Sequence, residues 1–146
     1  MPMLYHKSLT LPNDLHAIPE LTAFIDAACE VTSFDDDMVL KMNLAIEEAV
    51  VNVISYAYPE GTQGKVEVTI TVDPQDFIVV ICDSGKPFDP TQKEDVDITL
   101  PAEKRPIGGL GIFLVRQLMD SVSYERRNGE NILTLMKALP QENKNQ

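Results

Sequence analysis

Residues 46–52 read Ile-Glu-Glu-Ala-Val-Val-Asn and place polar side chains beside a strongly apolar stripe. The stripe continues at helical spacing in both directions through Val39, Met42, Ile46, Ala49, Val50, Val53, Ile54 and Ala57. The carboxylates of residues 35–37 suit a helix N-terminus, and Pro59 and Gly61 follow the last apolar residue. The pattern therefore predicts one long amphipathic helix from about residue 35 to residue 57.

Two polar residues of this helix lie on a common face. Glu48 and Asn52 are four residues apart, so they can reach a shared ligand, whereas Glu47 points about 100° away. The same pair would also fit a solvated helix edge on which the asparagine makes a local hydrogen bond. The spacing alone leaves both interpretations open.

The flanking sequence predicts the other elements of the fold. The apolar patterns indicate strands at 3–11, 66–72, 77–82, 121–127 and 131–139, and further helices at 15–31 and 109–119. Asn128-Gly129 is a strong hairpin signal between the last two strands. The order β-α-α-β-β-loop-α-β-β predicts an α/β (α+β) fold, a two-layer sandwich with a mixed, mainly antiparallel sheet and three helices on one face.

Two further segments carry polar or glycine residues where a ligand could bind. Asp83-Ser84-Gly85 follows six apolar residues, so the aspartate is either a turn former or a placed acceptor. Gly108-Gly109-Leu110-Gly111 precedes an amphipathic helix, and glycines there let the backbone approach phosphates, although a flexible hinge or cap is the alternative. The segment lacks the Gly-Lys-Ser/Thr of a P-loop, and it follows a loop rather than the strand of a dinucleotide fingerprint.

We interpret residues 1–146 as a single domain. Residues 84–106 contain four prolines and little periodicity, which predicts a long functional loop; we call residues 84–108 the lid segment. The polar residues 141–146 are expected to be disordered. No apolar run approaches the ~20 residues of a membrane span, and the N-terminus lacks the pattern of a secretory signal, so we expect a cytoplasmic protein that does not enter membranes.

Charge and composition argue against some classes of partner and some kinds of site. The net charge of −11 repels phosphates, which argues against direct nucleic-acid binding. Cys29 and Cys82 are too few for a disulfide framework, and both are expected to be buried thiols. His6 and His16 have no Cys or His at ligand spacing, so a zinc site is not expected.

The joint order of these segments resembles the ATPase fold shared by gyrase, sensor histidine kinases and the mismatch-repair protein MutL. Within that superfamily the chain looks most like the anti-sigma-factor serine/threonine kinases. The resemblance rests on Glu48 to Asn52, on Asp83-Ser84-Gly85-Lys86-Pro87-Phe88-Asp89-Pro90 and on Gly109 to Val115, and it extends from residue 4 to about residue 138.

The resemblance implies roles for individual residues. Asn52 would help to hold Mg²⁺ bridged to the phosphates of ATP, and Glu48 would be the general base. Asp83 would accept a hydrogen bond from the exocyclic amine of adenine, with Gly85 giving the base room. Gly108, Gly109, Leu110 and Gly111 would form the turn that closes over the phosphates.

The sequence departs from the family pattern in two places. Many relatives carry another glycine after Asp-x-Gly where this chain has Lys86-Pro87, and many carry a threonine near Glu130 or Asn131. Both differences bear on nucleotide contacts. Lys104 and Arg105, just ahead of the glycine-rich turn, are either phosphate-neutralising or solvated residues of the lid segment.

The family implies a partner switch. The protein would sequester a sigma factor and, as an ATP-dependent serine/threonine kinase, phosphorylate an anti-sigma-factor antagonist; a homodimer through the first strand and first helix is also implied. Two alternatives remain open: a partner-sequestering module without kinase chemistry, and a detached ATPase domain of a histidine kinase.

Overall fold

The computed structural model describes residues 4–92 and 111–141. The strands are β1 Tyr5–Pro12, β2 Lys65–Val72, β3 Asp76–Asp83, β4 Ser121–Arg127 and β5 Glu130–Ala138. The α-helices are α1 Ile18–Cys29, α2 Asp36–Tyr56 and α3 Gly111–Leu118, and two short 3₁₀ helices span Leu15–Ala17 and Pro90–Gln92. The predicted order of elements is confirmed.

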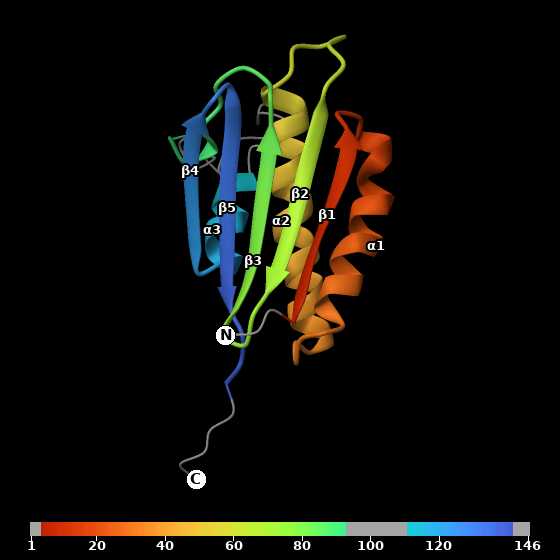
Figure 1. Cartoon of the computed structure of the whole chain (residues 1–146), viewed down its shortest axis with the longest axis vertical. Coiled ribbons are helices and arrows are strands. Elements are labelled where there is room, and N and C mark those ends of the chain that lie inside the picture. The colour runs from red at the N-terminus through yellow and green to blue at the C-terminus, as the bar shows by residue number, and fades with distance from the viewer. Residues whose placement is uncertain (1–3, 93–110, 142–146) are drawn as a thin grey trace, which may run out of the picture.

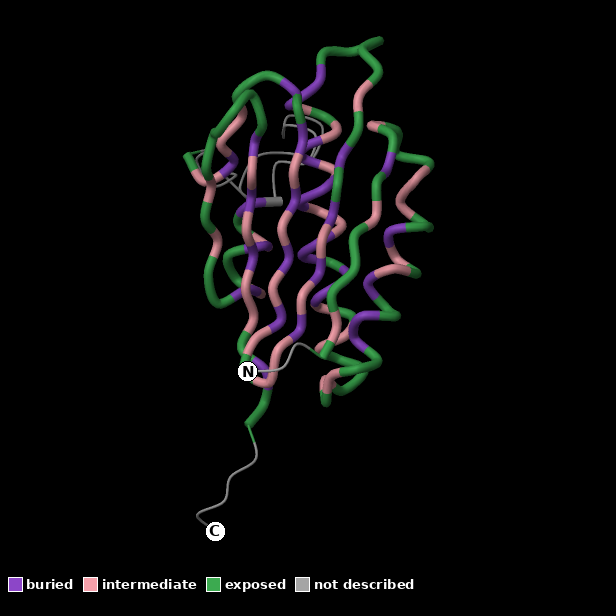
Figure 2. Tube along the Cα trace, in the orientation of Figure 1, coloured by how far each residue is buried: buried purple, intermediate pink, exposed green. Residues whose placement is uncertain are grey.

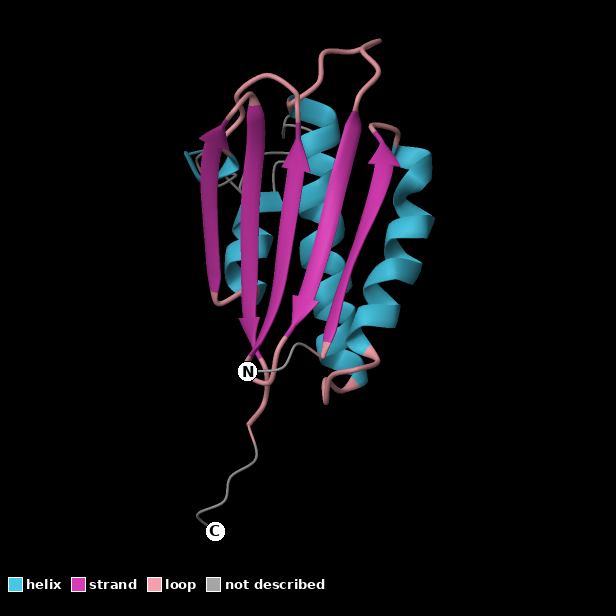
Figure 3. Ribbon diagram, viewed as in Figure 1, coloured by secondary structure: helices cyan, strands magenta, loops and turns pink. Residues whose placement is uncertain are grey.

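The five strands form one sheet in the order β1-β2-β3-β5-β4. The three α-helices cover one face of this sheet, which confirms the predicted two-layer sandwich (Figures 1 and 3). All four strand pairings are antiparallel, so the parallel component that a mixed sheet allows is absent from the described strands. The chain reverses three times between β1 and β2, entering α1, entering α2 and entering β2, which brings β2 back antiparallel to β1.

Burial alternates along the strands, as Figure 2 shows by colour. In β3 the side chains of Phe77, Val79 and Ile81 are fully buried against the helices, while Ile78, Val80 and Cys82 are only half-buried on the other face. The continuous apolar run of this strand is therefore covered on one side. The expectation of two buried thiols is correct for Cys29 and wrong for Cys82.

Helix α2 lies in the centre of the helical layer. Its N-terminus is capped by Asp35, whose Oδ1 accepts from the amide of Met38 at 2.8 Å. Its apolar stripe is buried against the sheet, through Met42, Ala45, Ile46, Ala49, Val50 and Val53. Asn43 and Asn52 are also buried in α2, and buried amides of this kind call for an explanation.

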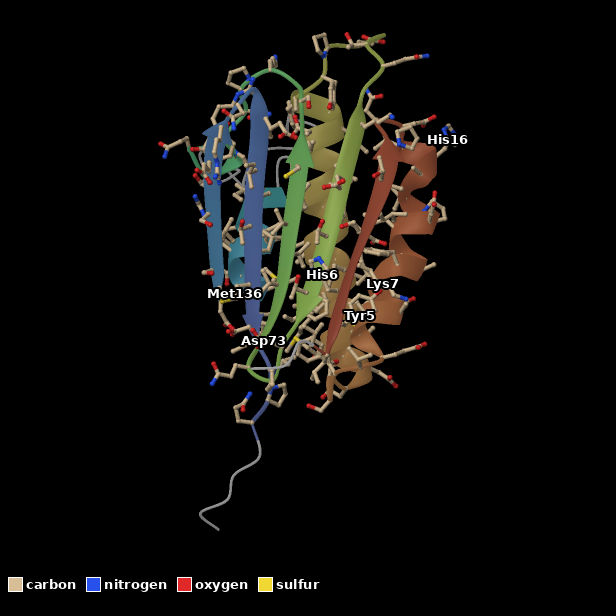
Figure 4. All side chains as sticks on the ribbon, viewed as in Figure 1. Tyr5, His6, Lys7, His16, Asp73 and Met136 are labelled. Atoms are coloured by element: carbon tan, nitrogen blue, oxygen red, sulfur yellow. The ribbon has the colours of Figure 1, made fainter. Side chains whose placement is uncertain are left out.

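The hairpin between β4 and β5 follows its sequence signal. Asn128 and Gly129 both have positive φ, 53° and 79°, which is the geometry that two-residue hairpin turns prefer. The two histidines lie apart, His6 on β1 and His16 beside the upper end of α1 (Figure 4), and their rings bond to Thr71 and Asp14 respectively. Among the described residues, no helix has the length and apolar character to cross a membrane.

Candidate nucleotide-binding site

The candidate residues gather at one end of the sandwich. β3 ends there with Asp83, β5 begins there, and α2 ends there behind them, at the top of Figure 1. The β3–β5 register places Asp83 directly opposite Asn131. The end of α2 is joined to the chain after β3 by a bond from the amide of Lys86 to the carbonyl of Ala57, 2.8 Å long. Three sequence segments that are far apart therefore meet at this end.

Asp83 is a buried carboxylate, with 3% of its surface exposed. Its Oδ1 accepts from the amide of Gly85 at 2.8 Å and from Nδ2 of Asn131 at 2.9 Å. Burial raises the pKa of Asp83, while these two bonds and the charge of Arg126 act in the opposite direction. Both described side-chain bonds use Oδ1, so Oδ2 remains as an acceptor for a ligand.

Asn52 is a buried amide with one unused polar atom. Only 4% of the Asn52 surface is exposed, and its Nδ2 donates to the backbone carbonyl of Glu48 at 3.0 Å. Among the described residues nothing donates to its Oδ1. A buried acceptor without a partner costs about 1–3 kcal/mol. An amide oxygen is a ligand that Mg²⁺ accepts, so Asn52 fits the magnesium role that the resemblance implies.

The two adjacent glutamates of α2 face different surroundings. Glu47 accepts from the hydroxyl of Thr22 on α1 through its Oε1. Glu48 is half-buried on another face, and burial raises the pKa of its carboxyl. The predicted divergence of the two side chains is thus present in the structure. A partly desolvated carboxylate with a raised pKa is suited to accept a proton near neutral pH.

Gly85 packs tightly against the end of α2. A Cβ built on Gly85 would lie 2.3 Å from the carbonyl oxygen of Ala57 and 2.8 Å from its carbon. No side chain fits there without moving backbone. The family resemblance implied that this glycine makes room for the adenine base, and the structure adds a steric reason that is independent of any ligand.

The sequence marked the region of Asn131 only as a departure from the family pattern and gave this asparagine no role in the site. Asn131 is buried, and its Nδ2 donates to Asp83 and to the carbonyl of Lys86, at 2.9 and 2.8 Å. Its Oδ1 accepts from Tyr124 at 2.5 Å, from the amide of Phe88 at 3.1 Å and from Arg126 at 3.2 Å. The signal that was available is its place two residues after the hairpin turn, which sets the register of β5.

Tyr58 ties the end of α2 to two strands. Its hydroxyl donates to the carbonyl of Lys65 at 2.7 Å and accepts from the amide of Ser84 at 3.1 Å. The start of the lid segment is held from the other side by Arg116 of α3, which donates to the carbonyl of Thr91. Residues 84–92 are therefore fixed to both neighbouring helices.

The glycine-rich turn is described only at its last residue. Gly111 is the first residue of α3, while Gly108, Gly109 and Leu110 lie outside the described residues, as do Lys104 and Arg105. An open groove lies on the other side of the α2 C-terminus, lined in part by Asn13, Tyr56 and Gln63. None of Glu48, Asn52 and Asp83 lines that groove, so it is separate from the candidate site.

Comparison with known proteins connects this geometry to a family. The profile of the histidine kinase-like ATPase domain matches residues 11–137. The serine/threonine-protein kinase BtrW of Bordetella bronchiseptica is 32% identical over 94 residues, covering 64% of this chain and 66% of the relative. The serine-protein kinase RsbW of Listeria monocytogenes is 27% identical over 136 residues, with 88% and 85% covered. RsbW of Bacillus subtilis is 30% identical over 100 residues, with 66% and 62% covered.

In BtrW and the Bacillus RsbW, the match spans less than two thirds of the relative's own length. A solved structure agrees in fold: the RsbU and RsbW domains of Rv1364c from Mycobacterium tuberculosis superpose with a TM-score of 0.64 at 15% identity, covering 94% of this chain and 33% of that one. The chain therefore belongs to the histidine kinase-like ATPase domain family, and these relatives confirm its resemblance to the anti-sigma-factor serine/threonine kinases.

Proposed function

We propose that this protein is an ATP-dependent serine/threonine kinase that acts as an anti-sigma factor. It sequesters a sigma factor and phosphorylates an antagonist protein of that sigma factor. The observation that carries the proposal is the buried Oδ1 of Asn52, which has no partner among the described residues although it lies one helical turn from the half-buried Glu48. Asn43 of the same helix also has a buried Oδ1 without a partner, so the position of Asn52 beside Glu48 is what distinguishes it as a candidate ligand.

Each residue has a distinct task in this proposal. Asp83 holds the adenine through its exocyclic amine, and Asn52 ligates Mg²⁺ through Oδ1. When bound, ATP would supply the phosphoryl group and Mg²⁺ would offset the negative charge of its phosphates. Glu48 accepts the proton of the attacking serine or threonine hydroxyl, for which its desolvated carboxylate is suited. Gly108, Gly109, Leu110 and Gly111 provide the turn over the phosphates.

The charge of the protein supports protein partners over nucleic acid. A net charge of −11 disfavours contact with a phosphate backbone and favours a basic protein surface. We therefore propose a cytoplasmic regulator, built as a single domain, that acts on transcription through its sigma factor and without touching DNA or membranes.

We also propose a homodimer through β1 and α1. β1 is an edge strand with its outer side unpaired among the described strands, and Leu15, at the turn into α1, is 53% exposed. Light scattering should give a mass near twice 16.3 kDa. A mass near that of one chain would reject the dimer without affecting the kinase proposal.

The first experiment is calorimetric titration of the protein with ATP, with and without Mg²⁺. We expect binding that strengthens when Mg²⁺ is present. The variant Asn52→Ala should lose this magnesium dependence, and Asp83→Asn should weaken ATP about tenfold or more, since a hydrogen bond to a charged group contributes about 1.5–3 kcal/mol. Absence of binding at millimolar ATP would reject the kinase proposal and leave a partner-sequestering module.

The second experiment tests phosphoryl transfer. Each small antagonist protein encoded in the same genome is incubated with this protein and magnesium ATP, and phosphoserine or phosphothreonine is located by mass spectrometry. One antagonist should gain a single phosphate. A phosphohistidine product would favour the histidine-kinase alternative, and binding of a sigma factor without any transfer would favour the non-catalytic module.

A further inference from the structure

We infer that Asn131 is the positioning residue that makes the site selective for a 6-aminopurine. It holds Asp83 so that one carboxylate oxygen faces the base, and it ties that carboxylate to the start of the lid segment. The inference rests on the proposed ATP-binding function and extends it from the residue that reads the base to the residue that orients the reader.

The orientation of the Asn131 amide is fixed by its neighbours. The guanidinium of Arg126 and the amide of Phe88 can only donate, so the atom that faces them must be Oδ1. The carbonyl of Lys86 can only accept, so Nδ2 must face it and, on the same side, Oδ1 of Asp83. A flipped amide would place donors against donors and an oxygen against two acceptors. The donor end therefore always faces Asp83.

This orientation determines what Asp83 can do. Two donors, Nδ2 of Asn131 and the amide of Gly85, occupy Oδ1 at 2.9 and 2.8 Å. Their bonds fix the plane of the carboxylate and oppose the rise in its pKa that burial causes. In its ionised form the carboxylate accepts hydrogen bonds but does not donate them. An ionised carboxylate accepts a hydrogen bond from a purine that carries an amino group at position 6, and it repels a purine that carries an oxygen there.

Asn131 also connects the reader to the lid segment. It contacts Lys86 and Phe88 through their backbone, while Arg126 donates to the carbonyl of Gly85 at 2.9 Å. Lys86 and Pro87, which depart from the family pattern, lie within the segment that these bonds hold. We infer that Asn131 holds the entrance of the lid segment and the carboxylate of Asp83 together as one unit.

The test measures base preference with a matched control. Asn131→Asp keeps the size and the acceptor oxygen but replaces the donor facing Asp83 by a second carboxylate oxygen. The control is Asn43→Asp, because Nδ2 of Asn43 likewise donates to an aspartate, Asp26 at 2.9 Å, and to a backbone carbonyl, that of Val39 at 3.0 Å. That pair joins α1 to α2 and is not part of the candidate site.

Dissociation constants are measured for ATP and for the triphosphate of purine riboside, which lacks the 6-amino group. The wild type and Asn43→Asp should prefer ATP about tenfold or more. Asn131→Asp should reduce this preference to about threefold or less. Hydrogen exchange at the Phe88 amide checks the local fold, because Asn131→Asp retains its acceptor. If Asn131→Asp does not fold, Asn131→Leu removes the donor without adding charge and should show the same loss.

Three outcomes would overturn the inference in distinguishable ways. An unchanged preference in a folded Asn131 variant would show that the residue only packs. A wild type that binds both nucleotides equally would show that Asp83 does not read the 6-amino group, with ATP binding itself intact. A wild type that binds neither nucleotide at millimolar concentration would reject the proposed function and this inference together.

Discussion

The ring of Phe88 stacks on the ring of Tyr56, with centroids 5.6 Å apart and an interplanar angle of 29°. Tyr56 is the last residue of α2, and Phe88 lies in the lid segment five residues after the end of β3. This contact holds the lid entrance against the helix that carries Glu48 and Asn52. The start of the lid segment is therefore attached to the helix of the proposed site through side chains as well as through the backbone.

We expect the two rings to be energetically coupled. In a double-mutant cycle of Tyr56→Leu and Phe88→Leu, urea unfolding should give a coupling free energy of about 0.5–1.5 kcal/mol, the usual range for aromatic pairs. Pairing Tyr56→Leu with Phe113→Leu, a 41% exposed residue of α3, is the control and should give additive effects. Additivity in the Tyr56–Phe88 cycle would mean that the stack contributes no free energy.

Replacing Glu48 by glutamine should separate binding from chemistry. The variant keeps size and polarity, so ATP affinity should stay within about threefold, whereas loss of a general base should slow phosphoryl transfer about 10²–10⁴-fold. Glu47→Gln is the matched control, because Glu47 faces Thr22 of α1 and the glutamine oxygen can still accept from that hydroxyl. Retained transfer in Glu48→Gln would remove Glu48 from the catalytic role.

The pH dependence of transfer should report the carboxyl of Glu48. Burial raises the pKa of Glu48, so the group gains its proton at a higher pH than an exposed glutamate, whose pKa is about 4.3. Because the base must be ionised, the rate should fall as the pH drops through this raised pKa. The rate of single-turnover transfer is measured from pH 4.5 to about pH 8. An acid limb that persists unchanged in the residual activity of Glu48→Gln would assign it to another group.

Much of the fold was predictable because it depends on local patterns. The period of the apolar residues in α2, its acidic first turn and the Asn128-Gly129 hairpin each act over a few residues, and each is present as predicted. The side chains of Glu47 and Glu48 diverge for the same reason, since helix geometry alone sets their angle.

The features that the sequence did not predict depend on how segments far apart in the chain pack together. Asn131 is 48 residues from Asp83 in sequence, and only the pairing of β3 with β5 brings them together. Cys82 was misassigned because a continuous apolar run does not reveal that the sheet is covered on one face only. The tight contact of Gly85 with Ala57 likewise depends on how the end of α2 meets the chain after β3.

The contact at Gly85 leads to a last prediction, which separates two explanations of this glycine. If Gly85 serves to pack against α2, Gly85→Ala should destabilise the nucleotide-free protein by about 1–3 kcal/mol, because the new methyl group meets the backbone of Ala57 at 2.3 Å. The bond from Lys86 to Ala57 would break with it. Ser84→Ala, at the exposed neighbouring position, is the control and should stay within about 0.5 kcal/mol of the wild type.

If Gly85 serves only to make room for the adenine base, a different result is expected. The urea midpoint of Gly85→Ala without nucleotide would match that of the wild type, and the loss would be confined to ATP affinity. We expect the midpoint to fall before any nucleotide is added, because the atoms that the methyl group would meet belong to the helix and to no ligand. An unchanged midpoint would contradict the steric explanation and restore the one that the resemblance implied.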